Sequence, residues 1–477
     1  MNHPTISTTS TTSTTSTTST NSTNSTISTS STLGSAVLHA YKALPTKGKP
    51  QGKEWTVLAG LALVWSGTNK EDEPTIEVVA VATGNRCVGK HRQAGDDEGR
   101  VVVDCHAEVL VRRCFRRLLY DELMLMQQMS SDESLQTATH ASAQKDASLQ
   151  QRQLLVPFSS SFTSSTSSSS SSQSLYRLNP AATLHLVISQ TPCGDGSIYP
   201  LGTDSTPSVA SSAPLLITPA YNWTGAKPTI SGSDTRDRQL IGCQRTKSSR
   251  SDALLERRCE SFSCSDKLAL WCHVGLCGSM LGYFVQPVWL TSVVLLLGHM
   301  DVDTRENARM ATQRALIDRF QKEGRNELMG GVIPTIQASP LVFPKCKAAV
   351  LLLSSLSSSS TSSSSQSAAL PLKKKRKRKL STPSGYAIIS VKKHHEVLIS
   401  SKGILQGQTE TTKKKRTSVI ARSSFAESFR GLGGGGDGGG GGGGDCLSSY
   451  SEFKQRIAHD AYRRKKKSFV KLSTYKK

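Results

Sequence analysis

The stretch RVVVDCHAEVLVRRCFRRLLY (residues 100–120) contains the clearest structural signal in the chain. It opens with a short apolar run of three valines, which favours a buried strand. Apolar residues from Ala107 to Leu118 then recur at spacings of three and four, which is typical of one face of a helix. His106 and Glu108 are therefore expected where a strand gives way to a helix, beside the partly positive N–H groups of the helix start.

Apolar patterns on both sides of this junction alternate between strand and helix. Strands are expected at 54–66, 75–84, 183–189 and 288–298, and helices at 106–129, 263–284 and 304–320. Strands that alternate with helices imply an α/β fold with a layered core.

Several long stretches are too poor in apolar residues to form a packed core. Residues 1–45 are predicted to be a disordered Ser/Thr-rich tail, and low-complexity, disordered inserts are predicted near 130–175, 200–220, 353–372 and 430–445. One domain, interrupted by these inserts, is expected over residues 50–470.

The charge of the chain is strongly basic and unevenly placed. The formal net charge is +23, and residues 373–477 carry 26 Lys and Arg against 7 Asp and Glu. A basic segment suits a polyanionic partner such as RNA, because Lys and Arg release counterions from phosphates; a solvated tail is the alternative. The runs KKKRKRK (373–379) and KKKR (413–416) also resemble nuclear import signals, so we expect the protein in the nucleus, the cytoplasm or both.

The cysteines point to metal chemistry rather than to disulfide bonds. Eleven cysteines occur at irregular spacing, and no secretory signal pattern precedes them. Reduced thiols or metal ligands are therefore expected. The apolar stretch at 287–298 is shorter than the roughly 20 residues that a membrane helix needs, so no membrane association is expected.

His106, Glu108 and Cys193 match most of the nucleotide deaminase pattern H-x-E…P-C-x-x-C. In that pattern one His and two Cys bind Zn²⁺, and the Glu moves protons. The second Cys is missing here, because Gly196 stands three positions after Cys193. A catalytic zinc site needs its third protein ligand close in space rather than in sequence, so Cys264 becomes a candidate. Spacing alone leaves other candidates open, namely Cys87, Cys105, Cys114, Cys272 and Cys277.

Three segments together resemble one enzyme family. DCHAEV (104–109), TPCGDGS (191–197) and SCSDKLALW (263–271) occur in this order, and the combination is similar to the adenosine-to-inosine editing deaminases of RNA. The resemblance implies a cytidine-deaminase-like αβα core with a mixed sheet. It also implies that Cys264 is the third zinc ligand and that Glu108 transfers protons while water attacks C6 of adenine.

Two further segments resemble the branch of this family that acts on tRNA. They are GKEWTVLA (52–59) and WTGAKP (223–228). The resemblance implies a tRNA substrate, with the adenosine 3′ of the anticodon of alanine tRNA as its target. An editor of double-stranded RNA or mRNA and a catalytically inactive RNA-binding homologue are the alternatives. A DNA partner is not expected, and the protein is expected to be a monomer.

The same resemblance implies a buried inositol hexakisphosphate behind the zinc site. The matching binding positions are Arg86, Arg112, Arg113, Lys267 and Ser279. Asp104 and Lys267 are expected to relay hydrogen bonds from this cofactor to the metal, whereas Arg116 and Arg117 are expected on a solvated helix face. The chain departs from the family at Val103, Leu270 and Val391. Further contacts are expected from Tyr450, Lys454 and Tyr462.

Overall fold

The computed structural model describes residues 19–67, 72–136, 153–158, 176–202, 221–229, 240–247, 254–321, 332–359, 381–392, 394–408, 416–433 and 466–467. The expected cofactor contacts Tyr450, Lys454 and Tyr462 lie outside these residues, as does the basic run 373–379. Most positions of the four predicted inserts also lie outside them.

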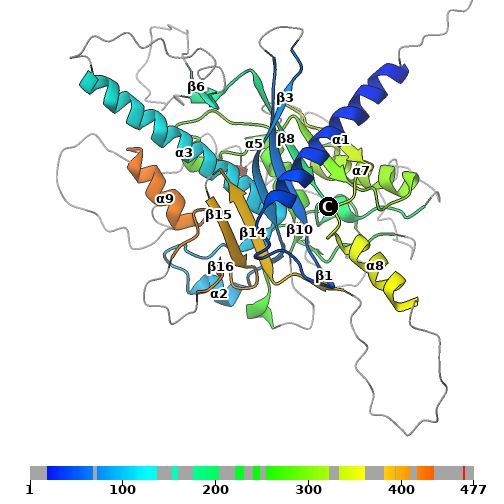
Figure 1. The fold of residues 1–477 in the computed structure, drawn as a ribbon. Helices are drawn as coiled ribbons and strands as arrows, with labels where there is room; N and C mark the ends of the chain where they lie inside the picture. The colour runs from blue at the N-terminus through cyan, green and yellow to red at the C-terminus, as the bar shows by residue number, and fades with distance from the viewer. Residues whose placement is uncertain are drawn as a thin grey trace, which may run out of the picture.

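An eight-stranded mixed sheet forms the centre of the fold (Figure 1). The strand order is β12-β11-β8-β2-β3-β14-β15-β16. These strands are β2 Leu58–Trp65, β3 Thr75–Thr83, β8 Ala182–Ile188, β11 Ser292–Leu296, β12 Thr335–Ser339, β14 Tyr386–Val391, β15 His394–Ile399 and β16 Ile404–Leu405. Strands β8, β11 and β12 run parallel, and the other pairings are antiparallel. The carboxyl ends of the three parallel strands therefore share one edge of the sheet, where α/β folds commonly place their sites.

The two faces of the sheet are covered by different helices (Figure 1). Ala59, Leu61 and Leu63 of β2 belong to the core that contains α3 Ala107–Gln136, α5 Cys264–Val274 and α7 Val302–Leu316. Leu58 and Ala62 point the other way and pack with α1 Ser19–Ala43. This alternation is the period of two that a strand imposes. The predicted α/β fold with a mixed sheet is confirmed. None of the described helices combines the length and apolarity needed to span a bilayer.

Shorter elements surround this framework. The helices are α2 Lys90–Ala94, α6 Gly278–Leu281, α8 Lys347–Ser359 and α9 Arg422–Gly431. Two-stranded pairs join β1 Glu54–Trp55 to β13 Thr382–Pro383, β4 Asn85–Cys87 to β5 Asp104–His106, β6 Leu155–Pro157 to β7 Tyr176–Leu178, and β9 Lys227–Pro228 to β10 Arg245–Thr246.

Helix α1 corrects the prediction of a disordered tail through residue 45. Its residues Leu33, Val37 and Tyr41, spaced by four, are buried against the sheet. The helix approaches β2 so closely that a Cβ atom at Gly60 would lie 2.5 Å from Val37. Average composition misled the prediction, because a single apolar stripe is enough to hold a Ser/Thr-rich helix once a sheet face is there to receive it.

Three smaller predictions also differ from the structure. The helix expected over 263–284 is divided at Gly275 and Gly278, which have φ values of +79° and +82°. The insert predicted near 130–175 contains β6, with Leu155 fully buried. The insert predicted near 353–372 begins inside α8, which continues to Ser359.

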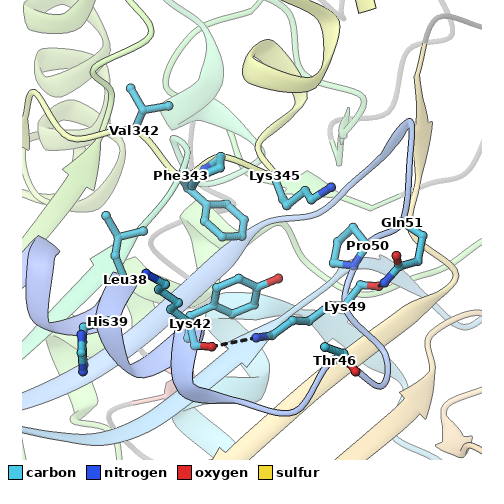
Figure 2. Close-up of a pocket in the computed structure, with 12 residues that line it drawn as sticks. Leu38, His39, Lys42, Thr46, Lys49, Pro50, Gln51, Val342, Phe343 and Lys345 are labelled. Carbon is cyan, nitrogen blue, oxygen red and sulfur yellow. Dashed lines mark hydrogen bonds between the residues drawn. The ribbon is translucent and has the colours of Figure 1, made fainter. Parts of the chain in front are cut away.

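A pocket of about 620 Å³ lies at the C-terminal end of α1 (Figure 2). Lys49 extends across it, and its Nζ donates hydrogen bonds to the carbonyl oxygens of Lys42 at 3.1 Å and Leu44 at 2.6 Å. The ammonium also lies 4.9 Å from the centre of the Tyr41 ring. Burial raises the pKa of Tyr41 to about 12. A cation therefore closes the carbonyl end of α1, where the helix dipole favours positive charge.

Candidate metal centre

Three side chains from three separate elements meet at the carboxyl edge of β8. His106 ends β5, Cys193 follows β8, and Cys264 begins α5. The Nδ1 atom of His106 lies 3.4 Å from Sγ of Cys264 and 3.8 Å from Sγ of Cys193. Ligands of a tetrahedral zinc ion are about 3.6 Å apart, so one ion can reach all three atoms. In the described part of the chain, this is the one group of His, Cys, Asp and Glu side chains that could hold a metal.

The loop that carries Cys193 is hydrogen-bonded to the start of α5. The amide of Cys264 donates to Sγ of Cys193 at 3.3 Å, and the amide of Ser265 donates to the Cys193 carbonyl oxygen at 3.0 Å. Gly194 has a φ of +110°, and a Cβ atom there would overlap the Ser263 hydroxyl. The glycine therefore permits the approach that brings two thiols together although 71 positions separate them.

His106 is held in place by backbone contacts with Gly84 and β4. Residue Asn85 of β4 is the register partner of His106 in β5, and the amide of Ala107 donates to the Gly84 carbonyl oxygen at 3.1 Å. Gly84 has a φ of +148°, and a Cβ there would overlap the Cys105 carbonyl oxygen. The strand-to-helix junction predicted from the sequence is present, and it orients the imidazole before α3 begins.

Glu108 lies in the first turn of α3 and is only 3 % exposed. Its Oε2 atom is buried and has no hydrogen-bond partner among the described residues. It lies close enough to Cys193 and Cys264 for its charge to oppose the ionisation of both thiols. A buried carboxylate oxygen is costly to leave unpaired, so this atom fits a site that receives a polar group from outside the chain.

The two thiols differ in acidity. A hydrogen bond from the Cys264 thiol lowers the pKa of Cys193, whereas burial raises the pKa of Cys264. Two buried neighbouring thiols resist ionising together, and a bound divalent cation would favour the deprotonation of both.

Asp104 links His106 to two lysines. Its Oδ1 accepts a hydrogen bond from the His106 amide at 3.1 Å, and its Oδ2 lies 2.7 Å from Nζ of Lys247. Lys267 also donates to Oδ2, and the Ser261 hydroxyl does so at 3.0 Å. Burial alone would raise the pKa of Asp104, but the two ammonium groups outweigh it and hold that pKa well below its usual range. Asp104 therefore remains a carboxylate.

Lys247 is the residue of this site that the sequence did not reveal. It follows β10 directly, lies 143 positions from Asp104 and is 4 % exposed. Burial would lower the pKa of Lys247, but Asp104 outweighs burial and holds the pKa well above its usual value. No local pattern in the sequence connects the two positions, because the ion pair joins residues that meet only in the folded chain.

The residues expected around inositol hexakisphosphate are brought only partly together. Arg112 packs over the Trp271 ring at 4.7 Å, and its Nη2 would lie 3.4 Å from a Cβ at Gly278, which is next to Ser279. Arg113 donates to the carbonyl oxygen of Ile420. Arg86 donates to the carbonyl oxygen of Pro383 at 2.7 Å, and Lys267 is engaged with Asp104. Of the positions at which the chain departs from the family, Val391 belongs to the hydrophobic core and Leu270 packs against it.

The solvated face predicted for Arg116 and Arg117 is wrong. Arg117 is 8 % exposed, and its guanidinium donates to Asp121 at 2.8 Å and to Ser428 at 2.7 Å. Arg116 lies 4.4 Å from the centre of the Phe425 ring. Helix α9 covers this side of α3, an arrangement between segments some 300 positions apart that the helix sequence alone does not encode.

The rival cysteine ligands lie elsewhere. Cys105, Cys114, Cys272 and Cys277 are buried as parts of the protein interior, and Cys87 is half-buried. None of them belongs to the three-ligand group.

Comparisons of the sequence with known proteins point to adenosine deaminases. A family model of the adenosine-deaminase (editase) domain matches residues 80–162 and 149–476. The chain is 27% identical to tRNA-specific adenosine deaminase 1 of Drosophila melanogaster over 57% of its own length and 56% of that protein. It is 29% identical to the protein of the same name in Schizosaccharomyces pombe, over 54% of this chain and 55% of that protein. The double-stranded RNA-specific editase Adar of Drosophila melanogaster is 29% identical, over 55% of this chain and 32% of that protein.

The chain thus spans about half the length of the two tRNA-specific relatives. The family model covers most of the chain and includes the three candidate ligand positions and Glu108. The protein belongs to the adenosine-deaminase (editase) family.

Proposed function

We propose that this protein is a zinc-dependent tRNA deaminase that hydrolyses adenosine to inosine. The observation that carries the proposal is the buried Glu108 carboxylate beside the ligand atoms of His106, Cys193 and Cys264. Two thiols and one imidazole suit zinc, and three protein ligands leave a fourth position open, as catalytic zinc sites require. When bound, zinc supplies a Lewis acid that lowers the pKa of water toward about 7.

Glu108 moves the protons of the reaction. Its carboxylate takes a proton from the water whose oxygen forms a bond to C6 of adenine. It then delivers this proton to N1 of the base and transfers the remaining hydroxyl proton to the exocyclic amino group, so that the bond from C6 to that nitrogen breaks and ammonia leaves. One water is consumed for each inosine formed. Asp104 acts as a positioning residue, because it accepts the His106 amide while two lysines keep it charged.

A tRNA substrate has three supports. The relatives from fly and fission yeast are named tRNA-specific adenosine deaminases. The net charge of +23 suits a polyanion. In addition, the WTGAKP segment lies beside the metal ligands, since the Gly194 amide donates to the Thr224 hydroxyl at 2.9 Å. We propose the adenosine 3′ of the anticodon in alanine tRNA as the target, because bases of an anticodon loop are already unpaired.

The test is incubation of the full chain with alanine tRNA, followed by sequencing for inosine. Wild-type protein is expected to form inosine at the single proposed position, and Glu108→Gln is expected to bind the tRNA without converting it. A double-stranded RNA offered in parallel separates the two branches of the family. Inosine only in the duplex would reject the tRNA proposal, and tight binding without any inosine would indicate an inactive homologue.

We also propose an inositol hexakisphosphate contacted by Arg86, Arg112, Arg113, Lys267 and Ser279. In support, the Nε atoms of Arg86 and Arg116 are buried without a hydrogen-bond partner among the described residues, and such donors suit an anion. When bound, the cofactor would neutralise guanidinium groups that are costly to bury. Denaturing the purified protein and quantifying released inositol phosphates by mass spectrometry tests this. About one molecule per chain is expected, less in Arg112→Met, and none at all in wild type would refute the assignment.

A further inference from the structure

Trp223 is the one tryptophan of the chain with a largely exposed side chain. It is 50 % exposed, whereas Trp65 and Trp271 are 4 % and 5 % exposed and the remaining two are half-buried. An indole is a large apolar surface, and leaving it in water forgoes the stabilisation that burial would give. What distinguishes Trp223 from the other exposed apolar side chains is its aromatic ring and its place beside the loop of Cys193.

Both neighbours of Trp223 are tied to the loop that carries Cys193. On one side, the Asn222 amide donates to the Tyr199 carbonyl oxygen at 2.8 Å, and the Asn222 side chain donates to the Ser197 carbonyl oxygen at 2.9 Å. On the other side, the Thr224 hydroxyl accepts from the Gly194 amide at 2.9 Å. Gly194 directly follows the metal ligand, so the backbone of Trp223 is held at a fixed place relative to it.

The segment that carries Trp223 is also anchored at its other end, after Thr224. The Ala226 carbonyl oxygen accepts from the guanidinium of Arg245 at 3.1 Å, and Arg245 is completely buried. The next residues form β9, which pairs with β10. The loop is therefore preorganised, and an indole that it presents loses little freedom on binding a ligand.

We propose that Trp223 stacks on a nucleobase of the RNA substrate next to the adenosine that enters the metal site. This inference rests on the proposed function. An adenosine that reaches a buried site must leave its own stack, and this uncovers the face of a neighbouring base. A flat, exposed aromatic ring on a rigid loop is suited to cover that face. Stacking uses the π-face that all bases share, so Trp223 strengthens binding of the RNA without selecting a particular base.

Substitution with tRNA as the probe tests the contact. Trp223→Ala is expected to weaken binding of alanine tRNA by about five- to a hundredfold, the range for loss of one base-aromatic stack, while Trp223→Phe retains most of the affinity. In the active protein, KM should rise while kcat at saturating tRNA stays unchanged, because a ground-state contact is lost. The matched control is Leu356→Ala, which removes a 60 % exposed apolar side chain from α8 and should change neither value.

Fluorescence reports on the indole directly. Alanine tRNA added to Glu108→Gln protein is expected to quench tryptophan emission, and the quenching should disappear in the Glu108→Gln, Trp223→Phe double variant. Normal affinity and undiminished quenching in the Trp223 variants would overturn the proposal. A structural role would show itself in three results: Trp223→Ala loses zinc or thermal stability, Trp223→Phe keeps its affinity for tRNA, and the Glu108→Gln, Trp223→Phe variant shows undiminished quenching. These results together would also overturn the proposal. If wild type forms no inosine in any RNA, the proposed function fails, and the quenching experiment still decides whether Trp223 touches RNA.

Discussion

Lys247 and Asp104 form an ion pair of 2.7 Å in which the side chains are 4 % and 6 % exposed. Removing one partner of a buried pair leaves the other charge without compensation. Because Lys267 remains on Asp104, we expect Lys247→Met to lower the free energy of unfolding by about 3 kcal/mol, measured by urea denaturation. Zinc content and deamination should fall with it, since Asp104 holds His106.

The exposed pair of Lys90 and Glu260, at 2.9 Å, provides the control. These side chains are 59 % and 70 % exposed, so water and salt screen the pair, and Lys90→Met should cost under about 1 kcal/mol. Equal effects of the two substitutions would show that the Lys247 pair has no special weight.

Cys264→Ala should abolish zinc binding, because a site with two remaining protein ligands cannot hold the ion tightly. Metal analysis of the purified protein measures this. Cys272→Ala, in the same helix and equally buried, should keep its zinc and lose only about 1 kcal/mol of stability from a small cavity. A Cys264→Ala protein that retained zinc and activity would refute the ligand assignment.

His185 makes stability depend on pH. Burial lowers its pKa to about 4, from a usual 6.5, and it is held between the hydroxyls of Thr183 and Ser292 at 2.9 Å and 2.8 Å. Between pH 6.5 and 4, His185 is therefore protonated in the unfolded chain but remains neutral in the folded chain. The contribution of His185 to the free energy of unfolding is full above pH 6.5 and falls by roughly 3 kcal/mol as the pH drops to 4. His185→Gln should flatten part of this slope in urea titrations. Parallel slopes for both proteins would contradict the assignment.

Lys49→Met should loosen the end of α1. The substitution removes a cation from two carbonyl oxygens at the helix terminus and is expected to cost about 1 kcal/mol. Hydrogen exchange of the α1 amides should accelerate, while Lys47→Met, at a nearby exposed position, should leave exchange unchanged. Unaltered exchange in the Lys49 variant would mean that the pocket does not depend on this contact.

These residues show how far a sequence can be interpreted. His106, Glu108 and Cys193 follow from residue spacing and from apolar patterns that end beside them, because those signals are local. Cys264 required a family resemblance, since its place beside Cys193 depends on Gly194 and on contacts across 71 positions. Lys247 was not found at all, because nothing near it in sequence records its partner.

The helices also show that a sequence does not record which surface a helix packs against. Helix α1 was missed because a Ser/Thr-rich composition conceals one stripe of three apolar residues. Arg117 was misplaced because the polar face of α3 meets α9 rather than water. In both cases the missing information was the surface against which the helix packs.

The antiparallel bridge between Pro200 and Tyr221 has a consequence for engineering and for evolution. Because the bridge holds Pro200 and Tyr221 together, we expect that a change in the number of residues between Gly202 and Tyr221 does not displace Cys193. Lengthening a segment whose two ends are held together costs little entropy, about 0.6 kcal/mol for each doubling of its length. Insertions between Gly202 and Tyr221 are therefore expected to be tolerated during evolution, and a reporter domain grafted there is expected to leave the Cys193 loop in place.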